Sequence, residues 1–168
     1  MPYDLSRLQL LIVEADDAMQ ATWRKLLAGF GIQSAAMVRG SREAWTILGD
    51  TAAAKPDLLA CRWELPAGDS GLDLVARLRQ DPDSPAPFLP AIIVTGSITR
   101  ERVNRALAAG VHEILVLPLS AKALETRLRE VIEKPRKFVR APGYFGPDRR
   151  RQVRPDYAGP FRRKTDRQ

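Results

Sequence analysis

Cysteine, histidine and long apolar stretches are what this 168-residue sequence has least of. The single cysteine, Cys61, cannot form an internal disulfide, so we expect a small buried residue in a protein of the reducing cytoplasm. With His112 as the single histidine, a transition-metal site is not expected. No stretch approaches the roughly 20 apolar residues that a membrane-spanning helix requires, and the first residues lack the basic start of a signal peptide.

Positive charge is abundant but unevenly distributed along the chain. Residues 1–133 contain 15 Lys and Arg against 17 Asp and Glu, a net charge of −2. Residues 134–168 contain 12 against 3, a net charge of +9. This asymmetry points to an anionic partner for the basic tail: a nucleotide, a nucleic acid, an acidic protein or a membrane surface. A disordered tail that serves solubility is the alternative.

The body alternates between short apolar runs and amphipathic stretches. The apolar runs are typical of strands buried on both faces, and they lie at 8–14, 32–38, 58–61, 91–95 and 113–117. The stretches with helical spacing begin at residues 17, 41, 70, 99 and 120. Alternating strands and helices with short loops predict an α/β fold with one parallel sheet, covered on both faces. In such a sheet a functional site lies beyond the carboxyl ends of the strands.

Several segments of the body, in their order and spacing, resemble the receiver domains of two-component response regulators, the CheY-like family. These segments are LIVEADD, PDLLACRWELP, GLDLVARLR, IIVTGS and AAGVHEILVLPLSAKAL. The resemblance spans residues 8–133 and implies a doubly wound five-stranded sheet with strand order 2-1-3-4-5, in a domain of residues 1–134. For the family it also implies a magnesium-dependent switch in which an aspartate accepts a phosphoryl group.

The acids that carry this chemistry in the family are largely replaced here. Of the two acids that hold magnesium after the first strand, Glu14 is present, whereas Ala15 replaces the second and Asp16 lies further along. Arg62 stands at the position of the phosphate-accepting aspartate, and the nearest carboxylate, Glu64, comes two positions later. Because a guanidinium stays protonated and is not a nucleophile, we expect neither phosphorylation in the family's manner nor magnesium binding.

The other positions of the family's site are only partly retained. The hydroxyl that contacts the phosphoryl group is retained as Thr95, but Leu117 replaces the lysine that pairs with the phosphoryl oxygens, and Ile114 replaces the aromatic switch residue. The degenerate site that the resemblance implies consists of Glu14, Ala15, Asp16, Arg62, Glu64, Thr95 and Leu117. The favoured interpretation is a non-enzymatic pseudo-receiver. An orthodox phosphorelay receiver with shifted acids is an alternative.

Arg62 needs a role in such a site. We expect its guanidinium to take the place of the metal and to pair with Glu14, because a cluster of acids would otherwise repel itself; Asp16 and Glu64 are further candidate partners. The alternative is a side chain that points into solvent beside Trp63.

Three further residues near the strand ends attract attention. Trp63 is either an exposed contact residue or a buried one, and the sequence leaves both open. His112 lies in a loop after Gly110 and is expected at the surface. Ser97 has no adjacent base, so hydrolase chemistry is not expected.

The tail, residues 135–168, contains five prolines and no apolar periodicity, so a largely irregular segment is expected. It nevertheless repeats itself: YFGPDRRR at 144–151 recurs 13 residues later as YAGPFRRK at 157–164. The Gly-Pro pair is expected to set a turn that brings the aromatic ring near the arginines. The candidate ligand-binding residues are Tyr144, Asp148, Arg149, Arg150, Arg151, Tyr157, Arg162 and Arg163.

The repeated unit suits a ligand that carries both guanines and phosphates. Arginine clamps phosphates or pairs with guanine, aromatic rings stack on bases, and Asp148 can accept from the amino edge of guanine. The tail resembles the arginine-rich C-terminal extension of the Cle group of CheY-like motility proteins, which implies binding of cyclic di-GMP. A tail that binds nucleic acid or an acidic protein partner is the alternative.

Together these features predict a signalling adaptor of a bacterial two-component or motility pathway. The resemblance implies that a protein partner docks on the fourth helix, fifth strand and fifth helix. A homodimer formed through helices stays open, because no residue pattern argues for or against it.

Overall fold

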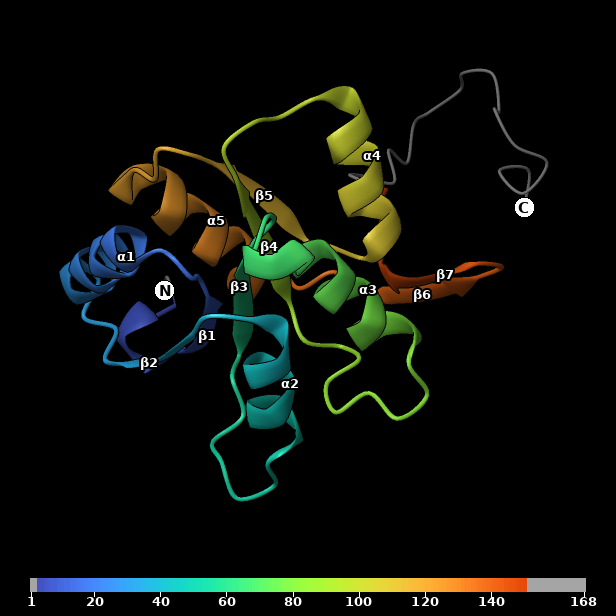
Figure 1. The fold of residues 1–168 in the computed structure, drawn as a ribbon, viewed down its shortest axis with the longest axis horizontal. Helices are drawn as coiled ribbons and strands as arrows, with labels where there is room; N and C mark the ends of the chain where they lie inside the picture. The colour runs from blue at the N-terminus through green and yellow to red at the C-terminus, as the bar shows by residue number, and fades with distance from the viewer. Residues whose placement is uncertain (1–2, 151–168) are drawn as a thin grey trace.

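Five parallel strands form the central sheet of the computed structural model, which describes residues 3–150 (Figure 1). The strands are β1 (Gln9–Val13), β2 (Ser34–Val38), β3 (Leu58–Arg62), β4 (Ala91–Thr95) and β5 (Glu113–Val116). Their order in the sheet is β2-β1-β3-β4-β5, and all four pairings are parallel. The fold class and the strand order predicted from the sequence are confirmed.

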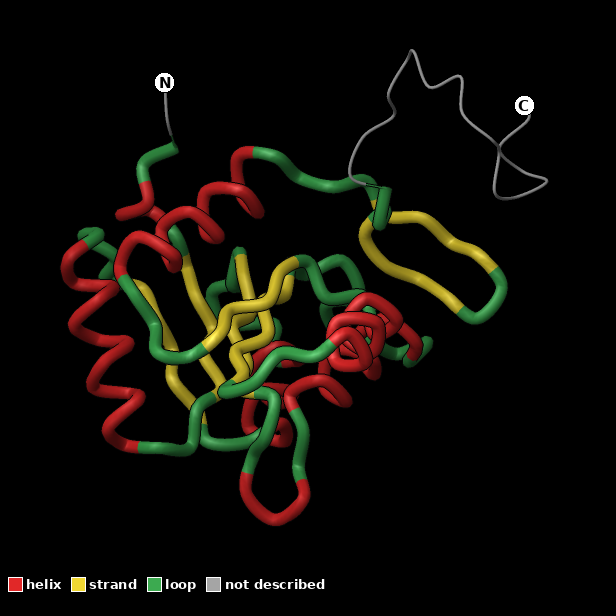
Figure 2. The backbone as a smooth tube through the Cα atoms, turned by 90° about the horizontal axis from the view of Figure 1, so that it is seen from above, coloured by secondary structure: helices red, strands yellow, loops and turns green. Residues whose placement is uncertain are grey.

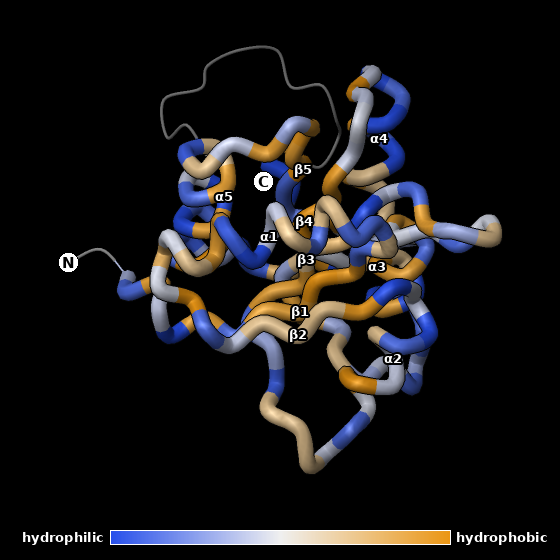
Figure 3. Tube along the Cα trace, turned by 60° about the vertical axis from the view of Figure 1, so that its left-hand side comes forward, coloured by the Kyte–Doolittle hydropathy of each residue, from blue (hydrophilic) through white to orange (hydrophobic). Residues whose placement is uncertain are grey.

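Helices cover both faces of the sheet (Figure 2). They are α1 (Asp17–Gly29), α2 (Ser41–Gly49), α3 (Gly71–Gln80), α4 (Arg100–Ala109) and α5 (Ala121–Glu133), with short 3₁₀ helices at Leu5–Arg7 and Pro66–Gly68. Apolar residues of α2, α3 and α4 fill one layer, and those of α1 and α5 fill the other. Neighbouring residues of β1, Leu11 and Ile12, belong to different layers. The strands serve both layers, so the sheet is the most hydrophobic part of the molecule (Figure 3).

Polar caps set where four of the helices begin. The side-chain oxygens of Asp16, Ser70, Thr99 and Ser120 each accept a hydrogen bond from the backbone N–H three residues later. These caps end the loops that leave the carboxyl ends of the strands, so they fix the geometry of that edge. In the part of the chain that the structure describes, no helix is long and apolar enough to cross a membrane.

An antiparallel hairpin follows α5, at the start of the segment for which the sequence predicts largely irregular structure. Strand β6 (Phe138–Ala141) pairs with β7 (Tyr144–Pro147). The turn between them lies at residues 142–143, where Gly143 has a φ of 71°. Gly146-Pro147, which the sequence places in a turn, lies in β7 instead. Each strand has four residues, too few for a periodic pattern to stand out.

Aromatic side chains dock this hairpin beside α3 and α4 (Figure 1). The rings of Phe138 and Phe145 lie 5.2 and 5.3 Å from that of Phe88, measured between centroids, in edge-to-face contact. Gly146 passes so close to the body that a Cβ atom there would lie 2.9 Å from the Cα atom of Gly110. The first part of the basic tail is therefore packed against the body.

Candidate functional site

The carboxyl ends of β1, β3, β4 and β5 meet at one edge of the sheet. Three pairs of opposite residues align them: Val13 and Cys61, Arg62 and Val94, Thr95 and Val116. Glu14 directly follows β1, and Arg62 and Thr95 end β3 and β4. The parallel register thus brings together the residues that the sequence singles out at this edge.

Arg62 turns toward Glu14, as expected. Its Nη1 atom lies 3.5 Å from Oε2 of Glu14, whose side chain is 3% exposed against 23% for Arg62. The other carboxylate oxygen of Glu14 accepts the backbone N–H of Asp16 at 3.0 Å. Both oxygens of this buried acid therefore have partners, and the alternative of an Arg62 directed into solvent is wrong.

The two other acids considered as partners of Arg62 are engaged elsewhere. Asp16 caps α1 by accepting the backbone N–H of Met19 at 2.7 Å. Glu64 forms an ion pair with Arg102 of α4. Arg62 is thus paired with Glu14 but not with Asp16 or Glu64.

Arg102 is a member of this site that the sequence did not reveal. Its Nη2 atom donates to the Thr95 hydroxyl at 2.8 Å and to Glu64, and its Cζ atom lies 4.1 Å from the centroid of the Trp63 ring. The Thr95 hydroxyl donates in turn to the backbone carbonyl of Ser97 at 2.9 Å. Trp63 is buried, so of the two positions that the sequence left open for it, the exposed contact residue is wrong. The available signal was the position of Arg102 in the first turn of the helix that follows Thr95.

The donor set at this edge does not fit a magnesium ion, which requires hard oxygen ligands. Ala15 offers no carboxylate, and its backbone carbonyl accepts Nη1 of Arg39 at 2.7 Å. Arg62 brings a cation to the end of β3, and Glu14 is already paired. Leu117 packs against the apolar layer of α1 and α5 instead of presenting an ammonium group.

A model of the response regulator receiver domain family matches residues 10–129. This chain belongs to the response-regulator receiver family. Among its relatives is chemotaxis protein CheY1 of Helicobacter pylori, 30% identical over 125 residues, which cover 74% of this chain and 97% of CheY1. The phosphate regulon transcriptional regulatory protein PhoB of Rhizobium meliloti is 32% identical over 126 residues, 75% of this chain. The match covers 52% of PhoB, so this chain spans about half the length of that relative.

Solved receiver structures share the fold. A response regulator from Chloroflexus aurantiacus superposes with a TM-score of 0.65 at 26% identity, covering 76% of this chain and 98% of the other. The receiver domain of sensor histidine kinase PA1611 from Pseudomonas aeruginosa, which holds a magnesium ion in its active site cleft, has a TM-score of 0.64 at 20% identity. It covers 76% of this chain and 98% of its own. The chain is a receiver domain of two-component or chemotaxis-type signalling.

His112 and Cys61 are further buried titratable groups of the receiver. His112 is buried, contrary to the surface position expected, and its Nδ1 atom accepts the backbone N–H of Ala91 at 3.3 Å. Burial and the cations of Arg79 and Arg136 lower the pKa of His112 to about 3, so the ring is neutral at physiological pH. Cys61 is buried as expected, and this burial raises the pKa of its thiol well above the ordinary value.

The first unit of the tail repeat is described in part. Arg149 stacks on the ring of Tyr144, with its Cζ atom 3.7 Å from the centroid, so the expected proximity of aromatic and arginine is present. Tyr144 donates its hydroxyl to the carbonyl of Pro147 at 2.7 Å, and Asp148 accepts the backbone N–H of Arg150 at 3.0 Å. The other candidate residues lie outside the described part of the chain: Arg151, Tyr157, Arg162 and Arg163.

Proposed function

We propose that this receiver is a signalling adaptor that cannot be phosphorylated and does not act as an enzyme. The observation that carries the proposal is the ion pair between Arg62 and Glu14, at the position where the family has its acceptor aspartate. A guanidinium has no lone pair to attack a phosphorus atom. The Thr95 hydroxyl is bound by Arg102, so the phosphate-sensing group is engaged as well.

Acetyl phosphate with Mg²⁺ tests this proposal, with intact-mass spectrometry as the readout. We expect no phosphoryl addition to the wild-type chain under conditions that label a receiver with an acceptor aspartate. A variant with Arg62→Asp, Ala15→Asp and Leu117→Lys restores the family's groups and is expected to gain the label. Labelling of the wild-type chain would instead support the orthodox receiver with shifted acids.

We further propose that the basic tail, residues 135–168, binds cyclic di-GMP. Three features support this: the net charge of +9 in residues 134–168, the repeated aromatic–Gly-Pro–arginine unit, and the stacking of Arg149 on Tyr144. The stack places a guanidinium and an aromatic face together, and these are the groups that hold phosphates and bases.

Calorimetric titration of cyclic di-GMP into the full chain tests the tail. We expect the double variant Arg149→Ala, Arg150→Ala to weaken binding by about tenfold or more, because charge-assisted contacts are lost. The matched control, Arg7→Ala with Arg42→Ala, removes the same charge from exposed positions of the body. Unchanged affinity in the tail variant would count decisively against this part of the proposal.

A tail that binds nucleic acid or an acidic protein is the second candidate, favoured by the charge asymmetry alone. Binding through phosphates alone weakens steeply with salt and does not distinguish guanine from adenine. A guanine-binding site discriminates between cyclic di-GMP and cyclic di-AMP at one fixed salt concentration. Comparing the affinities for cyclic di-GMP and cyclic di-AMP therefore distinguishes the two candidate functions of the tail.

The surface of α4, β5 and α5 is the face that we propose for a protein partner in the cytoplasm. A second copy of the chain stays an alternative occupant of this face. Sedimentation velocity over a range of protein concentrations distinguishes a dimer from a monomer.

A further inference from the structure

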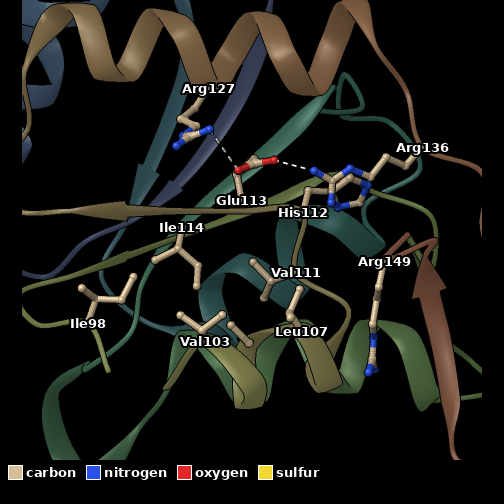
Figure 4. Close-up of a pocket in the computed structure, with 11 residues that line it drawn as sticks. Ile98, Val103, Leu107, Val111, His112, Glu113, Ile114, Arg127, Arg136 and Arg149 are labelled. Carbon is tan, nitrogen blue, oxygen red and sulfur yellow. Dashed lines mark hydrogen bonds and ion pairs between the residues drawn. The ribbon is translucent and has the colours of Figure 1, made fainter. Parts of the chain in front are cut away.

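A cavity of about 400 Å³ lies between α4, β5 and the segment that follows α5 (Figure 4). Its volume falls within the roughly 300–1,000 Å³ typical of small-molecule sites. One wall is apolar and is formed by Val103 and Leu107 of α4 with Ile114 of β5. Arg127 of α5 and Arg136 lie across from it. The cavity therefore has an apolar wall on the α4 side of β5 and cationic groups toward its α5 side (Figure 4).

Glu113, the first residue of β5, holds the two arginines in place. Its Oε1 atom lies 2.7 Å from Nη2 of Arg136, and its Oε2 atom lies 3.4 Å from Nη1 of Arg127. Arg127 also contacts the half-exposed Glu130 at 2.6 Å. A guanidinium carries five N–H donors, so these contacts leave donors of both arginines free for a ligand. The carboxylate of Glu113 is buried between the arginines and acts as their anchor.

A third cation comes from the end of the hairpin. Arg149 lines the cavity while its guanidinium stacks on Tyr144. The backbone N–H of Asp148 donates to the carbonyl of Lys137 at 2.8 Å, so the end of the hairpin is tied to its beginning. Arg136 and Arg149 thus reach the same cavity from the two ends of one docked hairpin. Of the described residues that line the cavity, three are arginines and one is a carboxylate.

We propose that this cavity binds one nucleotide unit of the anionic ligand, so that the receiver body and the tail form a composite site. Arg127 and Arg136 hold the phosphate, and Arg149, whose guanidinium points away from Glu113 (Figure 4), adds a third positive charge. Against the two carboxylates that pair with these arginines, Glu113 and Glu130, one positive charge is left for an oxyanion. The base or sugar lies against Val103, Leu107 and Ile114. The inference rests on the proposed binding of cyclic di-GMP and extends it to residues of the body.

A consequence for regulation follows from the position of the cavity. Its lining residues come from α4 and β5 and include Arg127 of α5. A ligand bound there covers part of the surface proposed for the protein partner. Ligand binding and partner docking are therefore coupled through direct contact at this face, without a change at the carboxyl edge.

Single substitutions in the body test the composite site in calorimetric titrations of cyclic di-GMP into the full chain. We expect Arg127→Gln and Arg136→Gln each to weaken binding by about tenfold, the cost of one charge-assisted hydrogen bond. Arg129→Gln is the matched control: Arg129 lies on the same helix, carries the same charge and pairs with Glu125 and Glu133. The control is expected to bind like the wild-type chain.

A measurement on the wild-type chain avoids any loss of folding in the variants. In methyl NMR spectra, cyclic di-GMP is expected to shift the signals of Val103, Leu107 and Ile114. The methyl groups of Leu48, a buried residue of α2 on another part of the body, are the internal reference.

The outcomes separate this inference from the function on which it rests. Absence of binding by the wild-type chain overturns both. If the wild-type chain binds and the tail variant does not, while Arg127→Gln, Arg136→Gln and the three methyl signals are unaffected, the tail alone forms the site. In that case the composite site is wrong and the proposed binding of cyclic di-GMP stands.

Discussion

The carboxyl edge of the sheet and the cavity beside α4 both gather arginines, yet the two regions balance charge in different ways. At the edge each guanidinium has its own carboxylate: Arg62 with Glu14, Arg102 with Glu64, and Arg39 with Asp17. In the cavity Arg127 and Arg136 share Glu113, Arg127 also pairs with Glu130, and Arg149 adds a further positive charge. The edge is internally neutralised, whereas the cavity wall keeps an excess of cations.

This difference indicates where an anion can act on the receiver. A paired edge attracts an added anion only weakly, because the charge of each guanidinium there is already balanced by a carboxylate. An excess of cations around a cavity favours an oxyanion. Helix α4 connects the two regions, since Arg102 contacts the edge and Val103 lines the cavity. We therefore infer that the position of the family's phosphate chemistry has become a structural ion pair in this receiver, and that response to an anion has moved to the far side of α4.

The largest effect is expected from breaking the balance at the edge. Arg62→Asp places a second carboxylate beside the buried Glu14, so we expect the free energy of unfolding to fall by about 3 kcal/mol. Millimolar Mg²⁺ is expected to return part of this loss, because two adjacent carboxylates suit the cation. Urea unfolding with and without Mg²⁺ measures both effects. Equal stability of variant and wild type would show that the pair with Glu14 is not structural.

At the cavity the corresponding change is Glu113→Gln. It leaves Arg127 and Arg136 without their shared acid, but water reaches both arginines, so we expect a smaller loss of about 2 kcal/mol. Sulfate is expected to stabilise this variant more than the wild-type chain, because it can replace the missing anion. Thermal unfolding in sulfate and in chloride at equal ionic strength measures the difference. The same sulfate response in Arg62→Asp would erase the contrast between the two regions.

Acid is expected to lower the stability of the fold through His112, which is buried beside the cavity. Its pKa is about 3 in the folded chain and 6.5 as the ordinary value, so below pH 6.5 the unfolded chain takes up a proton that the folded chain does not. Stability is therefore complete above pH 6.5 and is lost as pH falls toward 3. The loss reaches about 1.4 kcal/mol near pH 5.5. Urea unfolding from about pH 8 to 5.5 tests this, with His112→Gln expected to remove that part of the pH dependence.

The strands and the pair at the edge were predictable because they follow from local pattern and from the parallel register. The continuous apolar run of β4 allows one assignment, and strands that end side by side bring Glu14 and Arg62 together. These conclusions do not depend on how the helices pack against the sheet.

The missed features depend on contacts between distant segments. Arg102 reaches Glu64 because of the way α4 lies over the loop after β3, which its own sequence does not encode. His112 is buried partly under Phe138 of the hairpin, 5.6 Å away between ring centroids. The hairpin itself is held by Phe88 from a proline-rich connector, so its stability comes from a partner 50 residues earlier. Short strands of this kind form by docking rather than by propensity.

The smallest effect is expected at Arg102, the link between the edge and α4. Arg102→Gln loses the bond to Thr95 and the stack on Trp63, yet Glu64 is 57% exposed and water can replace the arginine there, so we expect a loss of about 1 kcal/mol. Urea unfolding measures it against Arg105→Gln, whose guanidinium lies further from the Trp63 ring at 5.6 Å.

Because Arg102 and Val103 are adjacent on α4, the same variant, Arg102→Gln, also probes coupling between the edge and the cavity. If the edge is closed and independent, Arg102→Gln leaves the affinity for cyclic di-GMP unchanged, whereas a change of several-fold would mean that α4 transmits the state of the edge to the cavity.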